Sequence, residues 1–320
     1  MKVAGLIIFV LIGIVGALTI GPTDLGPMDA VGALLGKGDQ TDIQIVREIR
    51  LPRAILAAII GAGLGASGAA LQGYTRNPLA APGILGFSAC ASLGAVAALY
   101  FGLVAWVPAA ALLGAALGAL LIILMVGPKK GANTLILAGV GIGALATAVT
   151  GLLMNLAPNP WALSEIVYWM MGSLKNADMK SVKITALLTA VGVGFLLATG
   201  PDLKTLSLGE LTAQSLGVSL ARVQILLILG VALSVGSGVA VAGTIGFVGL
   251  FVPHIMRLMF NADASRLIGL SALGGAGFLV FADMITRLLS GPGTPLYLGI
   301  LTSLIGVPFF LWLAIRGART

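Results

Sequence analysis

Few residues of this 320-residue chain carry side chains suited to catalysis or metal binding. It has one histidine, His254, one cysteine, Cys90, and 11 carboxylates scattered along the sequence. A structural zinc site needs about four His or Cys ligands, and a nucleophilic triad needs a histidine beside its nucleophile and a carboxylate. The sequence therefore predicts no enzyme activity, no metal site and no cofactor bound by this chain.

A phosphate-binding loop is also missing. Such a loop needs the pattern Gly-x-x-x-x-Gly-Lys-Ser/Thr, and the nearest approach is residues 32–38 (GALLGKG), which are one residue short and lack the hydroxyl. If transport by this protein uses ATP, we expect ATP and magnesium to bind another polypeptide.

The elements that position the remaining polar residues must be membrane helices. The chain is 58% apolar and 9% charged, whereas soluble domains carry about 25% charged residues. This composition excludes a soluble enzyme, a secreted disulfide scaffold and a disordered chain. The net charge of +7 does not indicate nucleic-acid binding, because basic residues flank membrane spans.

Uncharged intervals predict about ten transmembrane helices in a compact, all-α bundle that forms a single domain over residues 1–320. We expect two helices each in intervals 76–129 and 222–257, and one each in 2–24, 53–76, 130–154, 183–202, 266–283 and 287–316. The expected breaks are a turn at 106–108, a Pro-rich loop at 157–161 and Gly-rich interruptions at 236–238 and 243–249. A signal peptide is an alternative for the first span, although no Ala-x-Ala cleavage site follows it.

Glycine pairs four residues apart place small residues on one helix face and let helices approach closely. The pairs are Gly61/Gly65, Gly114/Gly118 and Gly139/Gly143. With the N-terminus in the cytoplasm and alternating spans, ten basic residues lie inside and eight outside. This excess follows the positive-inside rule and predicts that both termini are cytoplasmic.

Four segments stand out from the apolar background. They are residues 50–53 (RLPR), 76–86 (RNPLAAPGILG), 208–218 (LGELTAQSLGV) and 246–257 (GFVGLFVPHIMR). Taken alone, the arginines of the first could be snorkelling helix-end residues, and the third could be an ordinary solvated loop with glycine turns.

In their order and spacing these segments resemble the permease subunits of type II ABC importers for iron–siderophore complexes, haem and cobalamin. The resemblance runs from about Arg50 to Arg316. It implies a multi-pass protein of the bacterial cytoplasmic (inner) membrane that forms the pathway for a bulky chelate, with an iron–siderophore preferred. Its implied partners are a second permease chain, identical or paralogous, two ATPase subunits that bind ATP and Mg, and a soluble or lipid-anchored substrate-binding protein.

The resemblance also assigns roles to residues. Arg50, Arg53 and Arg287 match residues that dock the binding protein through its glutamates. The coupling segment, about residues 203–222, matches two short helices that dock on the ATPase. Its named residues are Leu208, Gly209, Glu210, Ala213, Leu216 and Gly217, and Gln214 replaces an arginine common in the family. Asn77, Leu79 and Asn133 match the cytoplasmic gate, which closes the pathway sterically.

Two positions leave alternatives open. Asp283 lies within an apolar span, where an ionisable residue is a functional candidate. Because it precedes Arg287 by four residues, it could instead be that residue's buried partner. His254 and Arg257 are expected to cap the short eighth span. Residues 295–299 (PLYLG) and 263–266 (DASR) depart from the family pattern, and the first departure lies near the expected outer vestibule.

A proton-driven transporter with Asp283 as its titrating group is the rival hypothesis. The lack of a second carboxylate within a span and the form of residues 208–218 argue against it. A structural or signalling membrane protein would leave the four segments unexplained.

Overall fold

The computed structural model describes residues 2–23, 25–127, 131–291 and 293–317, and most of this part of the chain is helical. Within these ranges, six helical segments are long and apolar enough to cross a membrane: Gln40–Thr75, Val104–Val126, Ala132–Asn155, Met179–Ala198, Leu220–Ala242 and Ala264–Leu289. Four shorter apolar helices, Val3–Thr19, Phe87–Tyr100, Val248–Phe260 and Leu298–Leu311, fall in the other predicted spans. The all-helical membrane fold is confirmed, and the number ten stays a prediction.

The bundle consists of α1 (Lys2–Thr19), α4 (Leu51–Thr75), α5 (Phe87–Tyr100), α6 (Val107–Val126), α7 (Ala132–Asn155), α9 (Met179–Ala198), α12 (Leu220–Ala242), α13 (Val248–Phe260), α14 (Ala264–Leu289) and α15 (Leu298–Gly317). Short helices connect them: α2 (Pro27–Leu34), α3 (Gln40–Gln44), the π-helix η1 (Ile45–Arg50), the 3-10 helices η2 (Pro82–Leu85) and η3 (Val104–Trp106), α8 (Pro160–Met170), α10 (Gly200–Leu206) and α11 (Glu210–Ser215).

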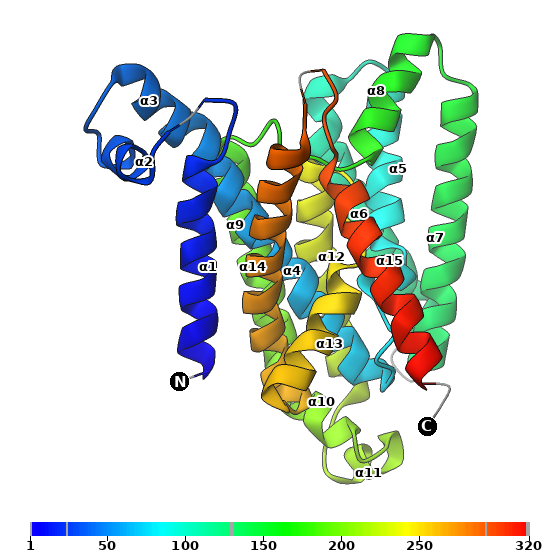
Figure 1. The fold of residues 1–320 in the computed structure, drawn as a ribbon. Coiled ribbons are helices and arrows are strands. Elements are labelled where there is room, and N and C mark those ends of the chain that lie inside the picture. The colour runs from blue at the N-terminus through cyan, green and yellow to red at the C-terminus, as the bar shows by residue number, and fades with distance from the viewer. Residues whose placement is uncertain (1, 24, 128–130, 292, 318–320) are drawn as a thin grey trace.

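The two ends of the bundle differ in what they carry. Figure 1 shows α2, α3 and α8 at one end, which we call the outer end. The N-terminus, the C-terminal end of α15, α10 and α11 lie at the opposite end, which we call the inner end. The coupling segment, the start of α1 and the C-terminal end of α15 therefore share one side of the bundle.

Helix α4 forms the centre of the bundle and packs against α14, α9, α13 and α12. A Cβ atom at Gly61 would overlap the carbonyl oxygen of Gly275, and one at Gly65 would overlap that of Ser271. Backbone therefore touches backbone between α4 and α14, which replaces side-chain interdigitation by close van der Waals contact. The predicted close approach at the Gly61/Gly65 pair is confirmed.

The other two glycine pairs also lie at helix contacts. A Cβ at Gly114 would overlap the carbonyl oxygen of Cys90 on α5, and one at Gly139 would lie 2.7 Å from the Cα of Leu85 in η2. These contacts hold α5 to α6 and η2 to α7. Small residues in the spans thus serve packing, as the sequence predicted.

The predicted interruption at residues 236–238 is wrong, because α12 continues through it to Ala242. Gly238 and Gly236 instead make room for neighbouring helices: Cβ atoms there would lie 3.1 Å from Ile60 Cγ2 and 2.7 Å from Ala115 Cβ. The break lies at residues 243–247, where Gly243 and Phe247 have φ angles of +68° and +63°. Glycine in a tightly packed span relieves crowding without ending the helix.

The Pro-rich stretch at 157–161 begins a helix that the loop prediction missed. Asn159 is the N-cap of α8, its side chain accepting a hydrogen bond from the Ala162 amide, and Pro160 is the first residue of the helix. Proline suits this position because its missing N–H would be unpaired there anyway. The signal was present in the sequence as an Asn-Pro pair ahead of an apolar run.

Candidate functional site

Arg50 is enclosed at the outer end and binds the end of α1. Its guanidinium donates hydrogen bonds to the carbonyl oxygens of Leu18, Thr19 and Thr23, and the residue is 3% exposed. Carbonyls in the last turn of a helix lack partners within the helix, and cations there also complement the helix dipole. Arg50 therefore caps α1, and snorkelling does not describe it.

Arg287 caps the same turn from α14. Its Nη1 donates to the carbonyl oxygens of Ala17 and Ile20, at 2.9 and 2.7 Å. Its Nε lies 3.2 Å from Asp283 Oδ2 as an ion pair one helical turn apart, and its side chain is 9% exposed. The intrahelical pair is confirmed, and together Arg50 and Arg287 satisfy four consecutive carbonyls at residues 17–20.

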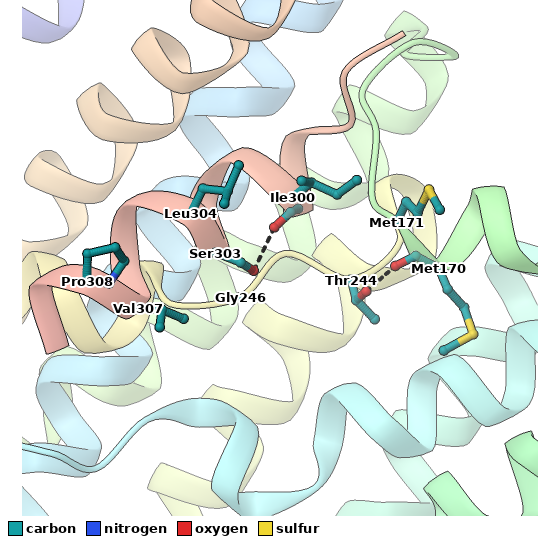
Figure 2. A pocket seen from close by; sticks show the side chains of 10 residues that line it. Met170, Met171, Thr244, Gly246, Ile300, Ser303, Leu304, Val307 and Pro308 are labelled. Carbon is teal, nitrogen blue, oxygen red and sulfur yellow. Dashed lines mark hydrogen bonds between the residues drawn. The ribbon is translucent and has the colours of Figure 1, made fainter. Parts of the chain in front are cut away.

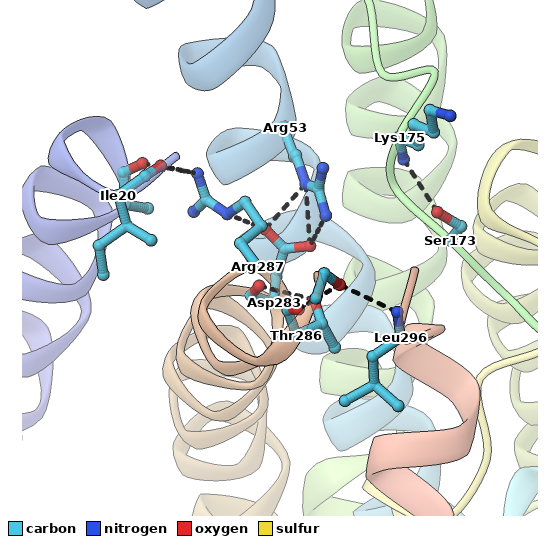
Figure 3. A network of polar contacts seen from close by, with 10 residues as sticks. Ile20, Arg53, Ser173, Lys175, Asp283, Thr286, Arg287 and Leu296 are labelled. Atoms are coloured by element: carbon cyan, nitrogen blue, oxygen red, sulfur yellow. Dashed lines mark hydrogen bonds and ion pairs between the residues drawn. The ribbon is translucent and has the colours of Figure 1, made fainter. Parts of the chain in front are cut away.

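Asp283 also binds Arg53 on α4, in the arrangement shown in Figure 3. Arg53 Nε lies 3.0 Å from both carboxylate oxygens, and its Nη2 lies 2.8 Å from Oδ1. The Asp283 side chain is 1% exposed, whereas that of Arg53 is 19% exposed. The buried carboxylate thus joins α4 to α14. These contacts favour a structural role for Asp283.

We call Arg50, Arg53, Asp283 and Arg287 the outer arginine cluster. Arg53 and Arg287 both bind Asp283, as Figure 3 shows, and Arg50 and Arg287 bind neighbouring carbonyls at the outer end of α1. The structure thus turns the three predicted docking arginines toward α1 and Asp283, with Arg53 the most accessible. Their docking role stays a prediction.

The predicted inner gate follows α4. Arg76 ends the helix in the left-handed conformation, with φ of +52°. Asn77 Oδ1 then accepts a hydrogen bond from the Leu79 amide at 2.9 Å, and both side chains are exposed. Asn133, also exposed, lies in the first turn of α7. The predicted non-helical segment after Asn77 is confirmed, and it leads into η2, which packs on α7.

The coupling segment presents an apolar surface at the inner end. Leu208, Leu211 and Leu216 are 64%, 82% and 63% exposed. Gly209 and Gly217 have φ angles of +106° and +89°, which favour glycine because it lacks a Cβ. The predicted glycine turns are confirmed. Ala213 is buried beneath this surface and anchors α11, so it does not contribute exposed area.

Two ion pairs fasten the coupling segment to the bundle. Glu210 Oε1 lies 3.8 Å from Arg76 Nη2, beside the predicted gate. Lys204 Nζ lies 3.2 Å from Oδ2 of Asp263, the N-cap of α14. The hydrogen bond from the Arg266 amide, followed by that from Lys204, lowers the pKa of Asp263 below its ordinary value.

His254 and Arg257 make contacts across helices. Arg257 Nη2 donates to Gln72 Oε1 on α4 at 3.1 Å, and the His254 ring packs edge-on against Phe309 of α15, with centroids 5.6 Å apart. Arg257 lies in the last turn of α13, where a cation complements the helix dipole. These contacts join α13 to α4 and α15 and fit a structural role.

A cavity of about 620 Å³ opens between α8, residues 244–246 and α15. Figure 2 shows its lining, which includes Met170, Met171, Ile300, Leu304 and the Ser303 hydroxyl that donates to Gly299. The residues 295–299 that depart from the family pattern lie beside it, and Tyr297 stacks on Tyr168 of α8 with centroids 6.0 Å apart. Sequence reasoning missed α8 and therefore this cavity.

No group of three or more His, Cys, Asp or Glu suited to a metal ion occurs among the residues that the structure describes. The polar clusters at both ends consist of ion pairs and helix caps. They can bind partners and hold helices, and they offer no nucleophile with a base.

Comparison with known proteins extends these observations. The profile of the FecCD transport family matches residues 7–316. The chain is 40% identical over 304 residues to the vitamin B12 import system permease protein BtuC of Vibrio cholerae, covering 93% of this chain and 89% of the relative. It is 35% identical over 327 residues to the Fe(3+)-citrate import system permease protein YfmD of Bacillus subtilis, covering 99% and 95%. A solved metal-chelate type ABC transporter in an inward-facing conformation superimposes with a TM-score of 0.88 at 31% identity, over 98% of both chains.

Proposed function

Because this chain belongs to the FecCD transport family of ABC importer permeases, we propose that it forms the membrane pathway for a bulky metal chelate. The candidate substrates are a ferric siderophore, haem and cobalamin, and an iron–siderophore is preferred. Relatives named as permeases for vitamin B12, Fe(3+)-citrate and hemin support this range. ATP, on this proposal, is hydrolysed by a separate subunit.

The exposed leucines of the coupling segment carry the proposal. Leu211 lies on α11, and Leu208 and Leu216 lie in the turns before and after this helix, at the inner end. An apolar projection outside the spans is costly in water, so a partner that covers it is expected. An ATPase subunit docked there would act next to Arg76 and the predicted gate, which the Glu210 pair places beside α11.

The remaining partners are proposed from the family. A second permease chain, identical or paralogous, would enclose the pathway with this one, and a substrate-binding protein would dock at the outer end. Arg53 is where contact with that protein's carboxylates is expected to begin, since it is the most exposed member of the outer arginine cluster. Arg50 and Arg287 would have to release the carbonyl oxygens of this chain before they could bind carboxylates of the binding protein.

The proposed location is the bacterial cytoplasmic membrane, with both termini in the cytoplasm. The excess of basic residues expected on that side supports this orientation. The start of α1 and the C-terminal end of α15 lie at the same end of the bundle as the coupling segment, which is consistent with it.

Reconstitution tests the function against the proton-driven alternative. Vesicles with the permease, its ATPase and its binding protein are expected to take up a chelate from a panel of ferric siderophores, haem and cobalamin when ATP is present. Uptake that ignores ATP and collapses with a proton ionophore would establish the rival transporter. Ligand-by-ligand rates would identify the substrate.

A further inference from the structure

Glu210 lies where the coupling segment meets both parts of the predicted gate. Its Oε1 is 3.8 Å from Nη2 of Arg76, the residue that precedes Asn77. Its Oε2 lies so close to Gly131 that a Cβ built there would be 3.1 Å away. Gly131 is the N-cap of α7 and stands two residues before Asn133.

The contact with α7 has a physical basis. The first turn of α7 contains no acidic residue, and its N-cap makes no side-chain hydrogen bond. The N-terminal amides of a helix lack partners within the helix and carry a partial positive charge. The Glu210 carboxylate, reaching across from α11, supplies the negative charge that α7 itself lacks.

The contact with Arg76 reaches the other part of the gate. Arg76 has a φ of +52°, and Pro78 two residues later restricts the backbone of Asn77. The Asn77 side chain closes the next turn by accepting from the Leu79 amide. A displacement of Arg76 is therefore passed along a short segment with little conformational freedom.

Both contacts are weak enough to be made and broken during a transport cycle. The side chains of Arg76 and Glu210 are 46% and 34% exposed, and ion pairs of this kind contribute little to stability. A buried ion pair would hold the predicted gate in one conformation. An exposed ion pair can shift the equilibrium between conformations without preventing movement.

We infer that Glu210 is a positioning residue that transmits movement of the coupling segment to both sides of the cytoplasmic gate. This inference rests on the proposed ATP-driven function. Glu210 faces the gate, and the ATPase contact falls to the exposed leucines beside it. The segment's second ion pair joins Lys204 to Asp263 at the start of α14, and we expect it to take no part in gating.

The test uses the complete importer and two readouts. Uptake per ATP hydrolysed is measured for Glu210→Gln, Arg76→Gln and the double variant. Gate movement is followed by an environment-sensitive fluorophore attached to the thiol of Asn133→Cys, in a Cys90→Ala background, with ATP added. Glu210→Gln is expected to lower the uptake ratio roughly three- to tenfold, because two weak contacts are lost together.

The variants give a pattern that a general loss of stability would not. Arg76→Gln is expected to have a smaller effect than Glu210→Gln, and the double variant is expected to be no worse than Glu210→Gln. Co-purification of the ATPase is expected to stay unchanged. In Glu210→Gln the fluorescence response at position 133 is expected to shrink by a similar factor.

Lys204→Gln is the matched control, since it removes an exposed ion pair from the same segment. An unchanged ratio and fluorescence response in Glu210→Gln, or an equal loss in Lys204→Gln, would overturn the inference. If the unaltered importer takes up none of the chelates and still shows an ATP response that depends on Glu210, the substrate proposal fails and the inference stands.

Discussion

At the residue scale, the outer arginine cluster places two guanidinium groups on one carboxylate and a third on the end of α1. Arg50 and Arg287 bind carbonyl oxygens at the end of α1, and Asp283 joins Arg53 to Arg287. Arginine suits these positions because its planar fork can bind several acceptors at once. The cluster fixes the mutual position of α1, α4 and α14 at the end where a binding protein is expected.

Replacing Asp283 with Asn is expected to destabilise the protein strongly. Breaking a buried ion pair costs about 3–5 kcal/mol, because the remaining charge is left uncompensated. Thermal unfolding in detergent or nanodiscs measures the loss, and Glu48→Gln, which removes an exposed carboxylate from η1, serves as the control. Normal thermal stability with abolished uptake would instead favour a titrating role for Asp283.

Asp263 gives a prediction about pH. Its pKa lies below the ordinary value of 3.8, chiefly because the carboxylate accepts the Arg266 amide hydrogen bond at the start of α14. A lowered pKa in the folded state stabilises the protein above the unfolded-state pKa, and that contribution is lost as pH falls through the folded-state pKa. The native chain is therefore expected to be more stable than Asp263→Asn at neutral pH. This difference in stability is expected to vanish in acid.

Melting temperatures of the two proteins between pH 7 and 3 test this expectation. Asp263→Ala should lose a further part of the N-cap contribution, since such replacements cost about 0.5–2 kcal/mol. A difference between Asp263→Asn and the native chain that stays constant down to the lowest pH would contradict the assigned pKa direction.

At the element scale, the coupling segment depends on its glycine turns. A Cβ at Gly217 would meet nothing within 4 Å, while the φ of +89° disfavours other residues. Strained backbone of this kind costs about 1–3 kcal/mol, so Gly217→Val is expected to reorient α11 without a steric clash. We expect ATP hydrolysis to continue and uptake per ATP to fall.

The same substitution at Gly194 is the control, because a Cβ there also meets nothing within 4 Å and the residue lies in the regular helix α9. Uptake and hydrolysis assayed together distinguish uncoupling from loss of protein. Normal coupling in Gly217→Val would mean that the geometry of this turn does not matter for transmission.

The elements also show where sequence reasoning succeeds. Gly61 and Gly65 predicted a close helix contact, and α14 provides it. The same kind of residue at 236–238 predicted a break that does not occur. The spacing of glycines indicates that one face of a helix is in close contact with another element. Which element packs there, and why it needs a small residue, is known only from the folded bundle.

At the scale of the whole molecule, the inner end combines the proposed ATPase surface with the predicted gate. Leu211 is 82% exposed at the tip of this end. Leu211→Asp is expected to prevent stable co-purification of the ATPase, because a charge in an apolar contact must be desolvated. The folded permease itself should be unaffected, since most of the side chain is exposed.

Arg266→Gln is the matched control, because it lowers the net charge by the same amount at an exposed position in the first turn of α14. Pull-down of the ATPase with each variant, together with size-exclusion profiles of the permease alone, makes the comparison. Full retention of the ATPase by Leu211→Asp would remove the coupling surface from the proposal.

The amino-acid sequence by itself determined the class of the protein. Scarce charges, long apolar intervals and the absence of a nucleotide-binding loop are properties of short stretches, and each can be judged without knowing the neighbours. The first two predicted an all-helical membrane protein, and the positions of glycine predicted the close helix contacts and the turns of the coupling segment.

Only the tertiary structure decided the partners of the polar residues. Arg53 and Asp283 are 230 positions apart, and Glu210 reaches both Arg76 and the N-terminus of α7 from a different part of the chain. Asp283 lies within a span, where an unpaired charge is costly and must find a partner. Which partner a polar residue finds depends on the path of the folded chain, and this path turned Arg50 and Arg287 toward α1 and placed Glu210 beside Arg76 and the start of α7.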